Sequence, residues 1–281
     1  MIDLHTHTTA SDGRCSPADL VARAAAAGVT VLAVTDHDTV AGCEAAAEAC
    51  RASGVAFVPG LEITAMADGM DVHVLGYFVD TRSPALHAFL AAQRQCRIDR
   101  VRQMIDRLAS LGMPLDADAI VRPAMNDPSR AAGRPWIARA LVAAGYAATT
   151  NEAFERWLAH GCPAFVPRAG ATPEEVFARI HDAGGLASVA HPALIARDEW
   201  LDGFAAAGAD ALEAYHADHD ADATARYLGI ARRLGLAVSG GSDFHGDESH
   251  GGAPGSVALP CEEYDRLLAR RQSQRRPRTL G

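Results

Sequence analysis

The sequence predicts an α/β fold in which seven short strands alternate with helices around a parallel sheet. Apolar or β-branched runs of strand length recur along the chain, and Ala-rich helical segments separate them. The chain has 281 residues, of which 49% are hydrophobic, enough for one large domain or a domain with an insertion. With this hydrophobic fraction the chain is expected to fold and not to be disordered.

Four strands are predicted in the first 79 residues, at 1–7, 29–35, 55–63 and 72–79. The first helix opens at Ser16 and Pro17, residues that favour a helix start, and the second covers about 40–52. Three more strands are expected at 186–190, 211–215 and 236–239, and helices near 198–207 and 222–234 separate them. Seven strands are therefore expected in all.

The strand pattern disappears in the middle of the chain. The run 86–111 predicts a long helix, and 126–133 is rich in turn-forming residues. We therefore divide the chain into a barrel domain, 1–83 with 168–281, and a helical insertion at 84–167 that we expect to cap the substrate.

Composition excludes several classes of function. All 26 basic residues are arginines, which rules out Walker-type P-loops, Schiff-base chemistry and a carboxylated-lysine metal bridge. The net charge of −9 argues against a broad surface for duplex nucleic acid. The six cysteines are scattered without a C-x-x-C pair, so we expect them to be reduced.

No membrane association is predicted. The most hydrophobic runs are of strand length, far below the roughly 20 residues of a membrane helix. Functional candidates begin at His5, which leaves no room ahead of them for a signal peptide. We expect a cytoplasmic protein without a predicted protein partner.

Histidines and carboxylates fall on the predicted strands, most of them where a strand ends. Because the carboxyl ends of parallel barrel strands meet on one face, residues distant in sequence should converge there. The H-x-H pair places both imidazoles on one side of its strand, which suits a divalent transition metal. Nine candidate ligands result: His5, His7, Asp12, His37, Glu62, His73, His191, Asp243 and His245.

Nine ligands are too many for one ion, since a metal takes roughly four to six including water. The number predicts two or three divalent ions with a bridging carboxylate, for which Glu62 is the natural candidate. Clustered metals generate hydroxide at neutral pH and neutralise charge on a phosphoryl group. Hydrolysis of a phosphate ester is the reaction that such a site suits best. A hydroxide held between two ions needs no protein nucleophile, and no G-x-S-x-G elbow or Cys–His pair is evident.

Five motifs resemble a known family. They are MIDLHTHTTASDG at 1–13, VTDHD at 34–38, GLEIT at 60–64, SVAHP at 188–192 and GGSDFHG at 240–246. Together they resemble the PHP (polymerase and histidinol phosphatase) family over essentially the whole chain. The resemblance implies a distorted (β/α)7 TIM-like barrel with a trinuclear centre of manganese, iron or zinc, and we expect manganese first.

The resemblance also implies how the ligands are shared among the ions. One ion would bind His5, His7, Glu62 and Asp243, a second Glu62, His73 and His191, and a third Asp12, His37 and His245. Asp36 and Asp38 are expected to orient His37.

The insertion and the segment AYHADH at 214–219 look like the stand-alone nucleotide phosphoesterase branch of the family. This likeness implies removal of the 3′-phosphate from nucleoside 3′,5′-bisphosphates such as pAp. The alternatives are a 5′-3′ exonuclease on short 5′-phosphorylated oligoribonucleotides and a histidinol-phosphate phosphatase. A metal-binding module without catalysis is disfavoured, because all nine ligand positions are filled.

Substrate phosphates are expected to meet arginines, whose guanidinium groups bind phosphate bidentately. The candidates for substrate binding are Ser129, Arg130, Arg134, Arg197 and His219. His216 and His219 flank a strand end, and His219 is the candidate acid for the leaving group, beside Asp243 as the second catalytic candidate. Trp136 could stack on a base. The other histidines, His87, His160, His181 and His250, are expected to be surface or structural residues.

Overall fold

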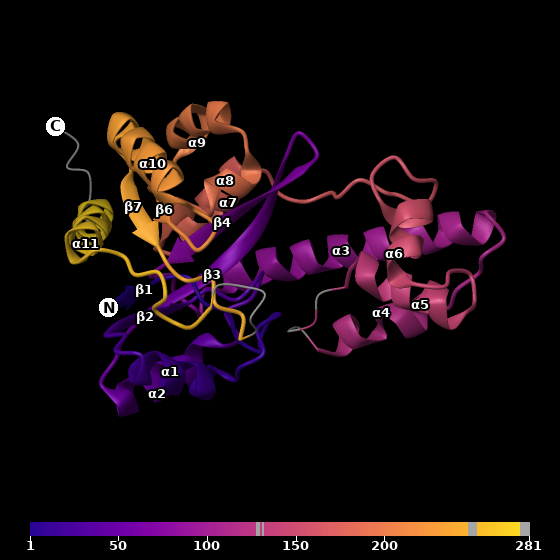
Figure 1. Cartoon of the computed structure of the whole chain (residues 1–281), viewed down its shortest axis with the longest axis horizontal. Helices are drawn as coiled ribbons and strands as arrows, with labels where there is room; N and C mark the ends of the chain where they lie inside the picture. The colour runs from indigo at the N-terminus through magenta and orange to yellow at the C-terminus, as the bar shows by residue number, and fades with distance from the viewer. Residues whose placement is uncertain (128–129, 131, 247–251, 276–281) are drawn as a thin grey trace. The chain divides into compact units, whose positions relative to one another are not determined.

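A computed structural model describes residues 1–127, 130, 132–246 and 252–275. Seven strands form one sheet in sequence order (Figure 1). They are β1 (Ile2–Asp3), β2 (Val31–Val34), β3 (Ala56–Ala67), β4 (Met70–Tyr77), β5 (Leu186–Val189), β6 (Ala211–Tyr215) and β7 (Ala237–Gly240). The segments after β1 and β7 meet through a parallel bridge between Thr6 and Phe244, which nearly closes the barrel. The predicted fold class is confirmed.

The expectation of an all-parallel sheet is wrong at one strand. β4 runs antiparallel to both β3 and β5, whereas the other pairs are parallel. Asp68 and Gly69 both have positive φ, 47° and 79°, and form the tight turn that a two-residue hairpin requires. The reversal brings the first half of β4 beside the end of β3, so that His73 pairs with Thr64.

Eight helical segments lie wholly within the described residues of the barrel part of the chain: α1 (Pro17–Ala26), α2 (Cys43–Ser53), α7 (Pro173–Asp182), α8 (Pro192–Ile195), a 3-10 turn (Asp198–Trp200), α9 (Leu201–Ala207), α10 (Ala221–Leu234) and α11 (Cys261–Arg275). α1 begins where the sequence predicts, because the Ser16 hydroxyl accepts the Asp19 N–H and Pro17 needs no partner at the first helical position. Its buried Leu20 and Val21 pack in the same core cluster as Leu32 and Val34 of β2.

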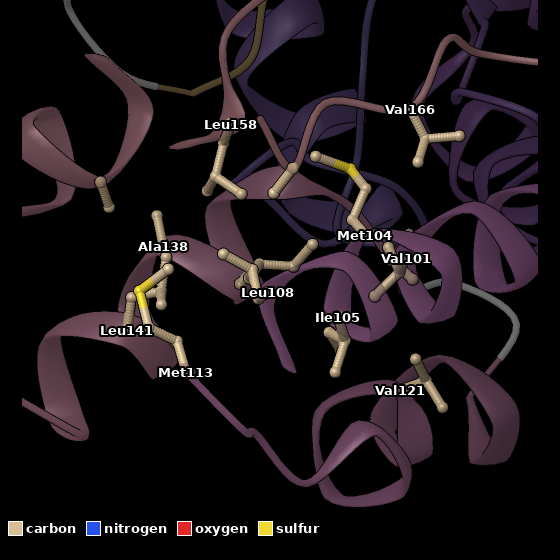
Figure 2. Packing of buried hydrophobic residues seen from close by; sticks show 14 of the residues in the cluster. Val101, Met104, Ile105, Leu108, Met113, Val121, Ala138, Leu141, Leu158 and Val166 are labelled. Atoms are coloured by element: carbon tan, nitrogen blue, oxygen red, sulfur yellow. The ribbon is translucent and has the colours of Figure 1, made fainter. Parts of the chain in front are cut away.

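The chain divides into two compact units, a barrel unit (Met1–Phe89 with Ala171–Gly281) and a helical unit (Leu90–Gly170). The helices that follow β4 are α3 (Pro84–Ser110), α4 (Ala117–Asn126), α5 (Arg134–Ala143), α6 (Thr150–Ala153) and a π-helical turn (Phe154–Leu158). The helical unit has a hydrophobic core of its own, in which Met104, Leu108 and Leu141 are fully buried (Figure 2). No strand occurs among its described residues.

All six cysteines are free, as the sequence predicts. Among the described residues, none of the helices combines the length and the apolarity that a membrane crossing requires.

A buried carboxylate ties several elements together at the start of β6. Asp210 is only 2% exposed. Its Oδ2 accepts hydrogen bonds from His181 Nε2 at 2.7 Å and from the Ala187 N–H at 3.0 Å. Its Oδ1 accepts from Arg270 Nε at 3.1 Å. Asp210 lies at the amino-terminal end of β6, and active sites of such barrels lie at the opposite, carboxyl-terminal ends of the strands, so we assign Asp210 to stability rather than to catalysis.

Asp210→Asn is expected to lower the free energy of unfolding by about 2 to 3 kcal/mol at pH 7, because the new amide would turn an N–H toward buried donors. Burial raises the pKa of Asp210, but the bonds from His181 and Ala187 outweigh it and the net pKa is lowered. The stability that the carboxylate contributes is therefore present above its unfolded pKa of about 3.9 and is lost as the pH falls through the lower folded value. Urea unfolding at pH 7 and below pH 4 tests this prediction, and the difference in stability between the wild type and the variant should shrink in acid.

As the control, Asp202→Asn removes the partner of Arg233 in an exposed ion pair and should change stability little. Equal effects of the two substitutions would contradict the prediction.

Candidate metal centre

Side chains from the ends of several strands converge at one end of the barrel unit. His5 and His7 follow β1 and are fully buried. Because side chains alternate along an extended backbone, the two imidazoles point to the same side, with ring centroids 5.2 Å apart. His37 follows β2 and pairs with Glu62 through an isolated parallel bridge. Glu62 itself lies in the middle of β3, not at its end as the sequence suggested, because the strand continues into the β3–β4 hairpin.

The Glu62 carboxylate, 1% exposed, is the centre of the cluster. Five imidazoles surround it: His5, His7, His37, His73 and His191. Three of them face Oε2 at 3.1 to 3.4 Å, and the other two, His73 and His191, face Oε1 at 2.9 and 3.1 Å. Each oxygen thus faces its own group of nitrogens, which is the geometry that a carboxylate bridging two ions requires.

Two further carboxylates complete the cluster. Asp12 lies 3.4 Å from His245 Nε2 and 3.6 Å from His37 Nε2. Asp243 Oδ1 lies 3.0 Å from His7 Nε2 and 3.2 Å from His5 Nε2. The structure therefore brings all nine predicted ligands together, although they span residues 5 to 245 of the sequence.

Several buried polar atoms in this cluster have no hydrogen-bond partner in the part of the chain that the structure describes: His5 Nε2, both ring nitrogens of His7, His191 Nδ1 and Asp243 Oδ1. Buried polar groups are nearly always satisfied, so this many orphaned atoms at one place indicates atoms that serve as ligands. Imidazole nitrogens with carboxylate oxygens form a donor set that manganese, iron and zinc accept. The residues present therefore fit the implied divalent ions.

The electrostatics of the cluster also favour the binding of cations. Burial raises the pKa of Glu62, but the neighbouring His37, His73 and His5 lower it well below its ordinary value overall. Burial lowers the pKa of His5, whereas Asp243, Glu213 and Glu62 raise it well above its ordinary value overall. The Glu62 carboxylate is thus ionised, and the positive charge beside it stabilises it. Divalent cations can replace that positive charge.

Among the described residues, four sets of side chains have ligand atoms close enough to share an ion: His7, Asp12, His37 and His245; His5, His216 and Asp243; His5, His7 and Glu62; and His37, Glu62 and His73. These sets overlap with the three that the family likeness implies but differ from them in several ways: there are four, His7 joins the group of Asp12, and His191 is in none of them. His37 faces both Asp12 and Glu62, and His216 joins the group of Asp243. The distribution of ligands over ions remains a prediction.

His216 is better placed to orient Asp243 than to bind metal. Its Nδ1 accepts the backbone N–H of Asp218 at 3.1 Å, so the proton of a neutral ring lies on Nε2. Nε2 is 3.3 Å from Asp243 Oδ2 and donates to it. This bond leaves Oδ1 of Asp243 directed at His5 and His7. The sequence placed His216 at a strand end but did not predict this contact.

Asp3 is a buried carboxylate beside the site whose role the sequence did not predict. It is fully buried and accepts from the Ser242 N–H at 2.9 Å and the Ser242 hydroxyl at 2.7 Å. Its other donors are the backbone N–H groups of Gly255 and His5. Asp3 thus holds the loop of Asp243 beside the first strand. Its signal was a charged residue between apolar neighbours in a predicted strand.

The predicted supporting residues hold loops of the site. Asp36, expected to orient His37, accepts from the Thr8 N–H at 2.7 Å and the Ser11 hydroxyl at 2.7 Å, and so holds the loop that leads to Asp12. Asp38 Oδ1 accepts the Thr64 N–H at 3.1 Å. Orientation of His37 by these carboxylates stays a prediction.

His219, the candidate acid and substrate ligand, lies beside His216 with ring centroids 5.4 Å apart. Its Nδ1 donates to the Ala214 carbonyl at 2.9 Å, and its buried Nε2 has no hydrogen-bond partner. Burial lowers the pKa of His219. The ring is therefore neutral at pH 7 in the free protein, and an anionic substrate would be needed to favour the acid form.

The predicted substrate arginines lie in different units. Arg197, in the barrel unit, is half exposed and lies 3.6 Å from Glu199. In the helical unit, the Arg134 guanidinium lies over Phe154, with 5.7 Å between guanidinium carbon and ring centroid, and Arg130 lies over Trp136 at 5.6 Å. Ser129 lies outside the described residues. Contact of these side chains with substrate stays a prediction.

The remaining histidines occupy other places. His87 Nε2 bonds to the Thr81 carbonyl, His160 packs on Phe165, and His181 bonds to Asp210. His250 lies outside the described residues.

The fold and the site define a barrel protein whose clustered histidines and carboxylates could hold metal ions. The chain belongs to the PHP domain family, whose model matches residues 3–129. It is 37% identical to the 5′-3′ exoribonuclease Rnm of Salmonella typhimurium, over 86% of this chain and 84% of that protein. It is 35% identical to the 3′,5′-nucleoside bisphosphate phosphatase of Chromobacterium violaceum, over 87% of each. A crystal structure from Bifidobacterium adolescentis, assigned as a metal-dependent phosphoesterase, superposes with a TM-score of 0.76 at 34% identity and 95% coverage of each chain. The protein is therefore a metal-dependent hydrolase of phosphoesters.

Proposed function

We propose that this protein removes the 3′-phosphate from nucleoside 3′,5′-bisphosphates, converting pAp to AMP and phosphate. The observation that carries the proposal is the convergence of six imidazoles and three carboxylates with orphaned polar atoms among them. The likeness to the Chromobacterium violaceum phosphatase supports this substrate class. Manganese is the ion we propose, with iron or zinc as alternatives, in two or three sites.

The nine clustered side chains would hold the ions, which when bound supply hydroxide from water at neutral pH and neutralise charge on the phosphoryl oxygens. Glu62 keeps its two oxygens turned to separate groups of imidazoles. His216 holds Asp243 by Oδ2. A substrate phosphate near His219 would favour a proton on Nε2, from which the ring can protonate the leaving oxygen.

A cysteine nucleophile is not needed, and the two buried helical thiols are poorly suited to be one. Burial raises the pKa of the Cys43 thiol to about 12 and that of the Cys50 thiol to about 11. Both therefore stay protonated at neutral pH and act as small apolar side chains of α2.

Phosphate release by the manganese-reconstituted protein tests the proposal. The substrates are pAp, 3′-AMP, 5′-AMP, histidinol phosphate and a 5′-phosphorylated dinucleotide, and the control protein is Asp243→Ala. Strong preference for pAp with 5′-AMP as product is the expected result. Activity confined to histidinol phosphate, or equal activity in Asp243→Ala, would overturn the proposal.

A second candidate function is 5′-3′ exonuclease activity on short 5′-phosphorylated oligoribonucleotides, the activity named for the Salmonella typhimurium relative. The charge distribution favours it. Residues 90–170 contain 11 of the 26 arginines but only 7 of the 35 acidic residues, which gives this segment a net charge of +4. Because the net charge of the whole chain is −9, the remaining residues carry a net charge of −13. A positive helical unit suits a polyanionic chain. Faster cleavage of the dinucleotide than of pAp would favour this function.

Arg134→Ala is expected to raise KM for pAp by about 10- to 100-fold, because a bidentate guanidinium–phosphate contact contributes about 1.5 to 3 kcal/mol. For a nucleoside monophosphate the rise should stay below about 3-fold, since only one phosphate needs to be held. Steady-state kinetics on both substrates measure the difference. Arg139→Ala, an exposed arginine on the same helix, is the matched control. An equal effect of Arg134→Ala on both substrates would remove it from the site of the second phosphate.

A further inference from the structure

Glu213 is a fully buried carboxylate of β6 that none of the predicted roles includes. Its Oε1 lies 3.0 Å from His5 Nδ1, and its Oε2 accepts the backbone N–H of His191 at 2.7 Å. One side chain therefore contacts two of the nine candidate ligands, His5 after β1 and His191 after β5.

The first contact determines which nitrogen of His5 is available. An ionised carboxylate only accepts hydrogen bonds, so Nδ1 of His5 must carry the proton. Its Oε2 already accepts the His191 N–H, and a carboxylate that faces donors with both oxygens is favoured in its ionised form. In the neutral ring that a metal would bind, the lone pair of His5 is then on Nε2. This atom lies 3.2 Å from Asp243 Oδ1 and 3.4 Å from Glu62 Oε2 and has no hydrogen-bond partner among the described residues.

The second contact holds an unfavourable backbone conformation. His191 has φ 25° and ψ 61°, a region that residues other than glycine rarely adopt. This conformation turns the chain into α8 while His191 Nε2 lies 3.1 Å from Glu62 Oε1. The bond to Glu213 Oε2 satisfies the N–H of the strained residue from the neighbouring strand.

We infer that Glu213 is a positioning residue for the metal centre: its two oxygens hold the ring proton of His5 on Nδ1 and the strained backbone of His191 in place. The inference rests on the metal centre of the proposed function. It extends the usual pairing of a ligating histidine with a carboxylate to a single carboxylate that supports two ligands.

Glu213→Gln separates this role from simple packing, because the amide has the same shape but only one accepting oxygen. If that oxygen faces His5, the amide N–H groups meet the N–H of His191. If it faces His191, the amide donates to His5 Nδ1 and moves the ring proton to Nε2. Neither arrangement supports both ligands.

Asp210, the residue just before β6, offers a matched control. Its carboxylate is also buried, and it accepts hydrogen bonds from the His181 ring and from the Ala187 backbone N–H. Its partners are not candidate metal ligands. Asp210→Asn should therefore lower stability without changing metal binding.

The test measures bound manganese per chain by equilibrium dialysis and elemental analysis on the full-length wild type and both variants. Glu213→Gln is expected to bind at least one ion about 10- to 100-fold more weakly, with a parallel loss of kcat and KM changed less than about 3-fold. Asp210→Asn should bind as the wild type does. Equal binding by Glu213→Gln and the wild type would overturn the inference alone, whereas a wild type that binds no divalent ion would overturn the proposed function with it.

A second measurement needs no variant of Glu213 and decides the matter if Glu213→Gln does not fold. Nitrogen-15 spectra of the zinc-loaded wild type, with the His5 signal assigned by its loss in His5→Asn, report which ring nitrogen carries the proton. A proton on Nδ1 is expected. A proton on Nε2 of His5 would overturn the inference.

Discussion

Glu62→Gln is expected to lower kcat by about 1,000-fold or more and to reduce the number of bound ions per chain. Five imidazole nitrogens lie within 3.4 Å of the two carboxylate oxygens. The amide keeps the shape of the side chain but removes the negative charge and turns an N–H group toward one set of nitrogens. A neutral amide is a poor bridge between two cations.

Turnover of pAp and metal content measured on the same samples test this prediction. Glu48→Gln, a solvent-exposed position on α2, is the control for loss of one acidic charge. Circular dichroism would check that the variant is folded. If Glu62→Gln keeps turnover within about 10-fold of the wild type, Glu62 is not the bridge of the centre.

Removal of divalent ions by a chelator is expected to abolish turnover and to lower Tm by roughly 10 °C. A ligand present at 1,000 times its Kd stabilises a fold by about 4 kcal/mol, and about 1 kcal/mol shifts Tm by roughly 2 to 4 °C for domains of this size. The physical reason is the set of buried nitrogens and carboxylate oxygens that lack other partners. Added manganese should restore both turnover and Tm.

Asp243→Ala provides the comparison for chelation. It lacks one of the three carboxylates of the cluster, so the chelator should shift its Tm less than that of the wild type. Full turnover in a chelated wild type from which the ions have demonstrably been removed would contradict a metal-dependent reaction.

Much of the fold follows from local patterns. Seven apolar runs predicted the seven strands, and the loss of that pattern after residue 83 predicted a helical segment. The direction of β4 relative to its neighbours could not be predicted from its own residues, because an apolar run of strand length has the same pattern in parallel and antiparallel strands. The turn at Asp68 and Gly69 contained the missing signal, since both residues tolerate positive φ and make a hairpin possible.

By itself, the sequence determined which residues were candidates for the centre. Strand periodicity places His5 and His7 on one side, and a barrel gathers strand ends on one face, so residue type and position were sufficient. Only the tertiary structure decided which atom faces which. His5 and Glu213 are 208 positions apart, and His216 and Asp243 are 27 apart. The proton on each ring, and hence the nitrogen left for a metal, depends on these contacts between different strands, which no local pattern encodes.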